Sequence, residues 1–123
     1  MKEQLGKVRS IFFGREDHGI LTFMVQVDFG GSTQGFGGYS LDIYDKELKR
    51  RVGHAAGTDL VLNLLNLFGV DELQRAEGMP VFAIRDSEGW SGKIIGLRTP
   101  NFDGGREFLI KDWQKKWFPN EME

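Results

Sequence analysis

The hydrophobic positions in the first half of the chain alternate with a period of two. Between residues 20 and 29, one face carries Leu21, Phe23, Val25, Val27 and Phe29. This period is typical of a half-buried antiparallel strand. We expect an earlier strand over residues 4–13, and the polar turn at residues 14–19 predicts that the two strands form a hairpin. Residues 34–44 are expected to continue the sheet.

The period lengthens to that of a helix between residues 58 and 69. Apolar side chains there follow i, i+3, i+4, i+7 spacing at Val61, Leu64, Leu65 and Phe68. We expect Thr58 or Asp59 to cap the helix start and Gly69 to end it in the left-handed conformation. Further leucines make the helix apolar beyond one stripe: Leu60, Leu62 and Leu67. Such a helix needs cover on two sides, either from the sheet and a second helix or from a partner chain.

The remaining segments complete the predicted order of elements. A short second helix is expected over residues 71–77, and strands over residues 80–85 and 93–98 should pair as a hairpin. A last helix over residues 110–118 stops before Pro119. The charged residues 45–51 are interpreted as a solvated connection. The fold class is therefore α+β: an antiparallel β-sheet with one main helix, a short second helix and a C-terminal helix, in a single domain of residues 1–123.

Composition narrows the function classes. The formal net charge is −2, which disfavours a general nucleic-acid binder, although a few local arginines would suffice for a small anion. The chain has no cysteine, so disulfides, thiolate-bound zinc and a thiol nucleophile are excluded. No apolar run approaches the roughly 18 residues of a membrane span, and the N-terminus lacks the apolar stretch of a signal peptide. We expect a cytoplasmic protein.

Catalytic constellations are sparse. Glu16, Asp17 and His18 bring acid, base and imidazole together, but consecutive turn residues rarely converge on one reacting atom. A hydrogen-bonded turn in which Asp17 caps backbone amides is the simpler interpretation. The other histidine, His54, has no neighbours at metal-ligand spacing. We expect no enzymatic activity, no metal and no cofactor.

A glycine-rich segment between aromatic residues, at residues 29–39, points instead to binding. It places five glycines within reach of ring faces on which a base can lie: Gly30, Gly31, Gly35, Gly37 and Gly38. At most one of Phe36 and Tyr39 can face the core of an extended segment, and the other is then free to stack. Trp90 lies in a glycine-flanked turn. Two roles for its side chain remain as alternatives: contact with a ligand or partner, and local packing.

Scattered basic residues supply the second half of such a site. They are surface charges by default, but a pyrophosphate needs planar forks that bind two oxygens at once. The candidate ligand-binding residues are Phe36, Tyr39, Arg51, Arg85, Trp90, Lys93, Phe102 and Arg106.

Four motifs taken together resemble a family of small phage and prophage proteins. They are Glu16-Asp-His-Gly-Ile-Leu-Thr22, the run from Phe29 through Gly-Gly-Ser-Thr-Gln-Gly-Phe-Gly-Gly-Tyr to Asp42, Arg51-Val-Gly-His-Ala-Ala-Gly57, and Gly92-Lys-Ile-Ile-Gly96. The chain is similar, within that family, to the first type of Thoeris anti-defence proteins. Those proteins are phage sponges that sequester the cyclic ADP-ribose isomer made by bacterial TIR enzymes.

The resemblance implies an antiparallel sheet flanked by helices, dimers that can assemble into hexamers, and pockets at protomer interfaces lined by aromatics and arginines. It also implies a cyclic ADP-ribose isomer as ligand in the cytoplasm of the infected bacterium, with cyclic oligonucleotides as a further ligand class and no binding to DNA or membranes. Residues 99–106 form a longer connection than in relatives, which leaves the preferred isomer open. Two alternatives to a sponge stand beside it: a phage accessory protein that inhibits a host factor by protein–protein binding, and a small hydrolase acting through Glu16, Asp17 and His18.

Overall fold

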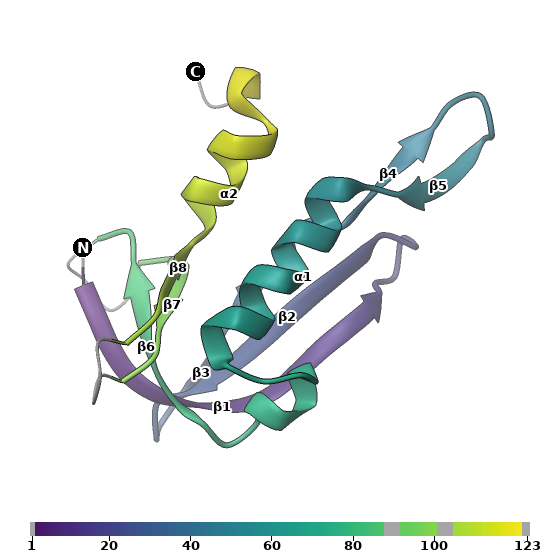
Figure 1. Cartoon of the computed structure of the whole chain (residues 1–123). Coiled ribbons are helices and arrows are strands. Elements are labelled where there is room, and N and C mark those ends of the chain that lie inside the picture. Colours follow the sequence, from purple (N-terminus) through teal and green to yellow (C-terminus); the bar gives the residue numbers. More distant parts are fainter. Residues whose placement is uncertain (1, 88–91, 101–104, 122–123) are drawn as a thin grey trace.

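The computed structural model of the chain describes residues 2–87, 92–100 and 105–121, and they form an α+β fold (Figure 1). The elements in chain order are β1 (Lys2–Arg15), β2 (Leu21–Asp28), β3 (Thr33–Gly37), β4 (Asp42–Asp45), β5 (Arg50–Gly53), α1 (Ala55–Phe68), the 3₁₀ turn η1 (Leu73–Ala76), β6 (Pro80–Arg85), β7 (Ile94–Arg98), β8 (Glu107–Leu109), α2 (Ile110–Trp117) and the 3₁₀ turn η2 (Pro119–Glu121). The predicted fold class is confirmed.

The main sheet is antiparallel and has the strand order β3-β2-β1-β6-β7-β8. The long strand β1 joins its two halves, because residues 2–7 pair with β6 and residues 7–15 pair with β2. A register shift between Val8 and Ser10 marks the point where β1 changes partners. Bulges of this kind bend a strand, and β1 curves visibly there (Figure 1).

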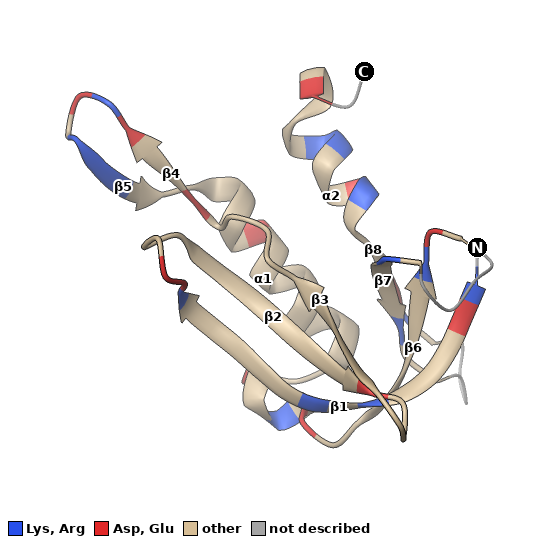
Figure 2. Ribbon diagram, turned by 180° about the vertical axis from the view of Figure 1, so that it is seen from behind, with Lys and Arg blue, Asp and Glu red and all other residues tan. Residues whose placement is uncertain are grey.

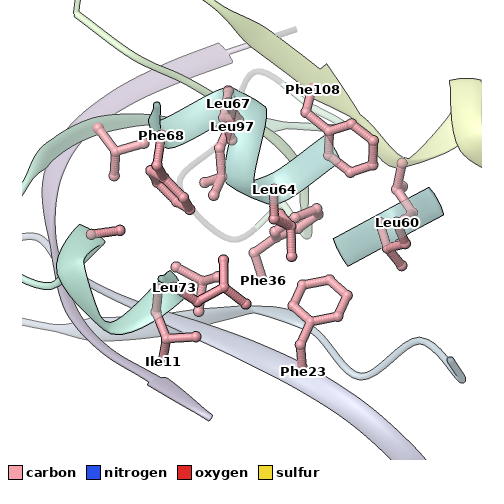
Figure 3. Packing of buried hydrophobic residues seen from close by; sticks show 14 of the residues in the cluster. Ile11, Phe23, Phe36, Leu60, Leu64, Leu67, Phe68, Leu73, Leu97 and Phe108 are labelled. Carbon is pink, nitrogen blue, oxygen red and sulfur yellow. The ribbon is translucent and has the colours of Figure 1, made fainter. Parts of the chain in front are cut away.

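Helix α1 lies across one face of the sheet and supplies much of the core (Figures 1 and 2). The alternation predicted for β2 is confirmed, since Phe23, Val25 and Val27 are fully buried. Figure 3 shows Phe23 and Phe36 from the sheet facing Leu64 and the rest of the apolar stripe of α1. The ring centroids of Phe23 and Phe36 lie 5.8 Å apart in an edge-to-face arrangement, a favoured geometry for aromatic pairs.

The start of α1 differs from the prediction. The helix begins at Ala55 with His54 as its N-cap residue, so Thr58 and Asp59 lie inside it and do not cap it. Asp59 instead accepts a hydrogen bond of 2.8 Å from Trp117 Nε1 on α2. The predicted end is confirmed, because Gly69 has a φ of 67° and its N–H donates to the Leu65 carbonyl.

Cover for α1 comes from two directions within the chain. The sheet packs against its buried leucines, and α2 is attached to it through a 2.7 Å hydrogen bond from Trp113 Nε1 to the Ala56 carbonyl. This arrangement accounts for Leu60 and Leu67, which are buried, but Leu62 remains 51% exposed. One apolar position of α1 is therefore left without cover in the single chain.

The segment predicted as one strand over residues 34–44 is divided in two. Strand β3 ends at Gly37, and Gly37 and Gly38 both adopt positive φ values. The chain then leaves the main sheet, and β4 pairs only with β5 in a separate two-stranded sheet. We call residues 42–53 the arm, because this hairpin extends beyond the end of the main sheet (Figures 1 and 2).

Three smaller expectations have definite outcomes. The charged residues 45–51, interpreted as a plain connection, form the tip and part of the second strand of the arm. The second helix is shorter than predicted, a 3₁₀ turn from Leu73 to Ala76. The hairpin of β6 and β7 is confirmed, whereas β8 was not predicted.

Candidate ligand-binding site

Residues 39–42, which follow β3 and end at the first residue of the arm, contribute to more than one hollow of the surface, and two of these carry polar groups suited to a nucleotide. The first has a volume of about 290 Å³ and is lined by Tyr39, Ser40, Trp113, Gln114, Phe118 and Glu121. The second has a volume of about 340 Å³ and is lined by Arg15, Gly19, Asp42, Arg50 and Arg51. We call them the aromatic hollow and the basic hollow.

Backbone contacts fix the segment that joins the two hollows. The Leu41 N–H donates to the Leu21 carbonyl at 2.8 Å, and Thr22 Oγ1 donates to the Tyr39 carbonyl at 2.7 Å. On its opposite side, the segment contacts α1 through the Leu41 carbonyl, which lies close to the backbone of Gly57. A Cβ added at Gly57 would come within 1.8 Å of the Leu41 oxygen. The segment is therefore held between β2 and α1.

Arg51 connects the two hollows through hydrogen bonds. Its Nε donates to Asp42 Oδ1 at 2.8 Å, and its terminal NH2 nitrogen donates to Ser40 Oγ and to the Asp42 carbonyl, both at 3.1 Å. The Leu21 N–H donates to both carboxylate oxygens of Asp42 at 3.3 Å. Burial raises the pKa of the Asp42 carboxyl, but the bonds from Arg51, Leu21 and Ser40 outweigh it and hold that pKa below its usual value.

The aromatic hollow is lined by rings and by one carboxylate, Glu121, and a cation that is not part of the lining lies near the ring of Tyr39. The Lys93 Nζ lies 5.6 Å from the centroid of the Tyr39 ring. Phe118 is in edge contact with Trp113 at 5.4 Å and stacks on His54 at 6.0 Å. Rings of this kind can stack against a planar base, and a lysine beside them can approach a negatively charged group.

Of the predicted site residues, the structure brings Tyr39 and Lys93 together. It places Arg51 in β5, where its side chain donates a hydrogen bond to Ser40 beside Tyr39. Trp90 and Phe102 lie outside the described residues. Of the other three predicted residues, Phe36 and Arg85 are buried, whereas Arg106 is exposed at the C-terminal end of α1.

Phe36 was wrongly predicted as a candidate stacking ring. Its side chain is fully buried among Phe23, Tyr39 and Phe108, with centroid distances of 5.8–6.3 Å. Strand alternation turns Phe36 inward, and the chain then leaves the sheet at Gly37. The expectation that at most one of Phe36 and Tyr39 faces the core is only partly met, because the half-buried Tyr39 ring also packs on Phe23 and Phe36 at 6.4 and 6.2 Å.

Arg85 is also wrongly placed in a ligand site, because its side chain is only 1% exposed. Its guanidinium donates to the Gln4 side chain, to the Gln34 side chain and, at 2.6 Å, to the Gly92 carbonyl. The Phe29 ring lies 5.3 Å from the guanidinium carbon. These contacts tie β1, β3 and β6 together, so Arg85 acts in the interior of the fold.

Arg106 lies at the far end of α1 from the arm. Its Nε donates to the Leu67 carbonyl at 2.9 Å, one of the helix carbonyls that lack a partner within the helix. The same side chain lies over Gly69, where an added Cβ would meet it at 2.7 Å. Arg106 therefore caps the C-terminus of α1. Its side chain is exposed and lines a separate hollow of about 220 Å³ that does not include residues 39–42, so it does not join Tyr39 and Arg51 in one site.

Sequence reasoning missed most of the lining residues, among them Arg15, Arg50, Trp113 and Phe118. Arg50 adjoins Arg51 in the charged run, which was dismissed as a connection. Trp113 was assigned to anchoring the last helix, and it does so, but its ring also forms a wall of the aromatic hollow. No local signal in the sequence places Arg15 beside the arm.

The Glu16-Asp17-His18 turn is built by its first residue. Glu16 Oε1 accepts hydrogen bonds from the backbone N–H groups of His18 at 2.6 Å and Ile20 at 3.2 Å. Desolvation raises the pKa of the Glu16 carboxyl slightly. The hydrogen bonds from Ile20 and His18 have a larger and opposite effect, so the pKa lies below its usual value. The cap predicted for Asp17 is thus provided by Glu16.

Among residues 2–87, 92–100 and 105–121, no three histidine, aspartate or glutamate side chains are grouped closely enough to hold a metal ion. No helix in the same ranges has the length and apolar character needed to cross a bilayer. We found no match to this chain among protein-family models, curated proteins or solved structures.

Proposed function

We propose that this protein binds a small nucleotide of the cyclic ADP-ribose class and holds it without cleaving it. The observation that supports this proposal most directly is that residues 39–42 form part of both the aromatic hollow and the basic hollow. A nucleotide diphosphate presents a flat base and a doubly charged pyrophosphate a short distance apart. The two hollows offer the two complementary chemistries on one rigid segment.

Each half of such a ligand has a physical reason to bind there. Stacking of one base on aromatic side chains contributes about 1–3 kcal/mol. Arginine forks bind phosphate oxygens in pairs and are more weakly hydrated than ammonium groups, which lowers the desolvation cost. Arg15 and Arg50 are exposed and line the basic hollow, while Arg51 is held in place by Asp42.

The sizes of the hollows indicate how the ligand is accommodated. At about 290 and 340 Å³, the two hollows lie just below and just above the lower limit of the roughly 300–1,000 Å³ of small-molecule sites. A ligand with two nucleoside-sized parts therefore needs both hollows, or a further wall from a second protein copy.

In its biological role, the protein would act as a phage anti-defence sponge in the bacterial cytoplasm, as the sequence resemblance implies. A sponge suppresses signalling by mass action, so it must be abundant relative to the signal and bind it well below its effective concentration. Cyclic oligonucleotides are a further ligand class under the same proposal.

The proposal is tested by incubating the full chain with cyclic ADP-ribose isomers and measuring binding by calorimetry. The complex is then heated, and the released compound is identified by mass spectrometry. We expect heat-dependent release of unaltered ligand, with linear ADP-ribose as the comparison compound.

Two results contradict the proposal in different ways. Release of a hydrolysed product would show an enzyme and would direct attention to the Glu16-Asp17-His18 turn. Failure to bind any of the nucleotides would favour an accessory protein that acts on a host factor by protein–protein contact.

A further inference from the structure

The basic hollow contains a carboxylate as well as arginines. Among the described residues that line it, Asp42 alone offers a side-chain hydrogen-bond acceptor, since the others are Arg15, Gly19, Arg50 and Arg51. Arginine side chains carry donors and no acceptor, and they match the oxygens of a phosphate group. A phosphate oxygen gains nothing beside a carboxylate, which has no proton to donate. The part of a ligand that lies next to Asp42 is therefore expected to be a hydrogen-bond donor.

The two carboxylate oxygens of Asp42 are used unequally. Oδ1 accepts hydrogen bonds from Arg51 Nε at 2.8 Å, Ser40 Oγ at 3.3 Å and the Leu21 N–H at 3.3 Å. Within the described part of the chain, Oδ2 accepts only the bond from the Leu21 N–H, also at 3.3 Å. This distance is longer than the roughly 2.7–3.2 Å of an ordinary N–H···O bond. Oδ2 therefore keeps the capacity to accept a further hydrogen bond.

The arginines of the hollow keep free donors for an anion. The Nε and NH2 nitrogens of Arg51 are bonded to Asp42 and Ser40, whereas its NH1 nitrogen has no hydrogen bond to any described residue. Arg15 has neither a hydrogen bond nor an ion pair in the same part of the chain. Arg50, which begins β5, makes only a 3.5 Å contact with the Arg51 carbonyl (Figure 2). Three guanidinium groups thus offer donors beside a single acceptor.

This combination of donors and acceptor fits a phosphorylated ribose better than a phosphate alone. The ribose of a nucleotide carries hydroxyl donors a few bonds from its phosphate, and carboxylates in nucleotide sites commonly accept hydrogen bonds from such hydroxyls. The volume of about 340 Å³ exceeds that of one phosphate group. Gly19 leaves one wall open, because nothing lies within 4 Å of a Cβ placed there. The hollow therefore has room for a sugar ring beside the phosphate.

We propose that the basic hollow binds a ribose phosphate, with the phosphate at the three arginines and a ribose hydroxyl donating to Asp42 Oδ2. Asp42 then makes the hollow selective for sugar phosphates that carry ring hydroxyls. This inference rests on the proposed function, since it takes the basic hollow as the site of the charged half of the nucleotide. It adds the group that the hollow recognises besides phosphate.

The first test compares two probes of equal charge on the full chain. They are methyl β-ribofuranoside 5-phosphate and its 2,3-dideoxy analogue, which lacks both ring hydroxyls. We expect the dideoxy analogue to bind about tenfold or more weakly, because it cannot form the hydrogen bond to a charged acceptor. Arg50→Gln should weaken the binding of both probes. The control is Arg75→Gln on η1, which should leave both affinities unchanged.

The second test measures the same pair of probes on Asp42→Asn. We expect the ratio of the two affinities to fall toward one, because the amide has lost the negative charge that strengthens the bond to a hydroxyl. Any loss of folded protein in this variant weakens both apparent affinities by the same factor, so it cancels in the ratio. The ratio therefore reports on recognition of the hydroxyls and not on stability.

Failure of this inference can be distinguished from failure of the proposed function. Equal affinities for the two probes, no binding of either, or an unchanged ratio in Asp42→Asn would overturn the ribose assignment. If a cyclic ADP-ribose isomer still binds in those cases, the proposed function stands without it. Selective binding of the riboside phosphate together with no binding of any cyclic isomer would support the ribose assignment and reject the proposed ligand.

Discussion

The carbonyl oxygen of Leu41 lies so close to Gly57 that a Cβ at that position would come within 1.8 Å of it. This approach fixes the spacing between α1 and the segment that joins the aromatic and basic hollows. No residue except glycine leaves room for it. The candidate site is thus built on a contact between two backbones.

Replacing Gly57 with alanine should therefore be costly, although alanine favours helices. We expect a loss of at least about 1–3 kcal/mol in the free energy of unfolding, the usual range for overpacking, because a backbone carbonyl cannot move aside as a side chain can. Urea denaturation measures the change. Gly31→Ala is the control, since nothing lies within 4 Å of a Cβ there, and equal stability of the two variants would contradict the proposed contact.

Asp42 should make the fold sensitive to acid. Because its pKa is lowered in the folded chain, its carboxylate stabilises the fold fully above its unfolded pKa of roughly 4, and this contribution is lost as the pH falls through the lowered value. Asp42→Asn should cost about 1–3 kcal/mol at neutral pH and lose less stability than the parent chain as the pH falls below about 4.

Thermal melts across that pH range measure the effect of Asp42. The matched control is Asp17→Asn, an exposed aspartate of the neighbouring turn, which should keep the parent pH dependence. Parallel pH curves for Asp42→Asn and the parent chain would show that the carboxylate is not held as described.

A substitution that removes one charge from the basic hollow should affect ligand binding without affecting the stability of the fold. Arg50→Gln removes an exposed cation of the hollow, and we expect affinity for a cyclic ADP-ribose isomer to fall about tenfold while the melting temperature stays nearly constant. The control is Arg75→Gln, which makes the same change of charge at a residue of η1 that lines neither hollow. Isothermal calorimetry on both variants is the measurement, and equal affinities would remove Arg50 from the site.

Arg106 should affect stability rather than ligand uptake. Arg106→Ala leaves the Leu67 carbonyl without its side-chain donor, and we expect a loss of about 1 kcal/mol, with partial recovery in Arg106→Lys, which keeps a cation at the helix C-terminus. Arg75→Ala breaks only an exposed ion pair with Glu72 and should stay within about 0.5 kcal/mol of the parent chain. Urea unfolding curves of the three variants measure these differences in the free energy of unfolding. Equal stabilities of Arg106→Ala and Arg75→Ala would show that Arg106 does not stabilise the C-terminus of α1.

Much of the fold follows from local patterns in the sequence. The alternation from Leu21 to Val27 and the helical spacing that ends at Gly69 depend on the period of each element and on the preference of glycine for positive φ, which are properties of short segments. The antiparallel sheet and the α+β class could therefore be predicted.

The candidate site could be predicted only in part, because burial and pairing depend on distant segments. Nothing near Arg85 in the sequence shows that Gln4 and Gln34 will enclose it, and nothing near Arg106 shows that it will reach the end of α1. Three arginines of the same chemistry thus have three roles, and of the three only Arg51 lines the basic hollow.

The sequence by itself determined the elements with a regular hydrophobic spacing, such as β2 and α1, since that spacing sets the face that each one buries. Only the tertiary structure decided where the chain leaves the sheet after Gly37 and brings Ser40 and Asp42 to Arg51. Those contacts arise from long-range packing of α1 against Leu41, and the free energy of such packing belongs to both segments together rather than to either one alone.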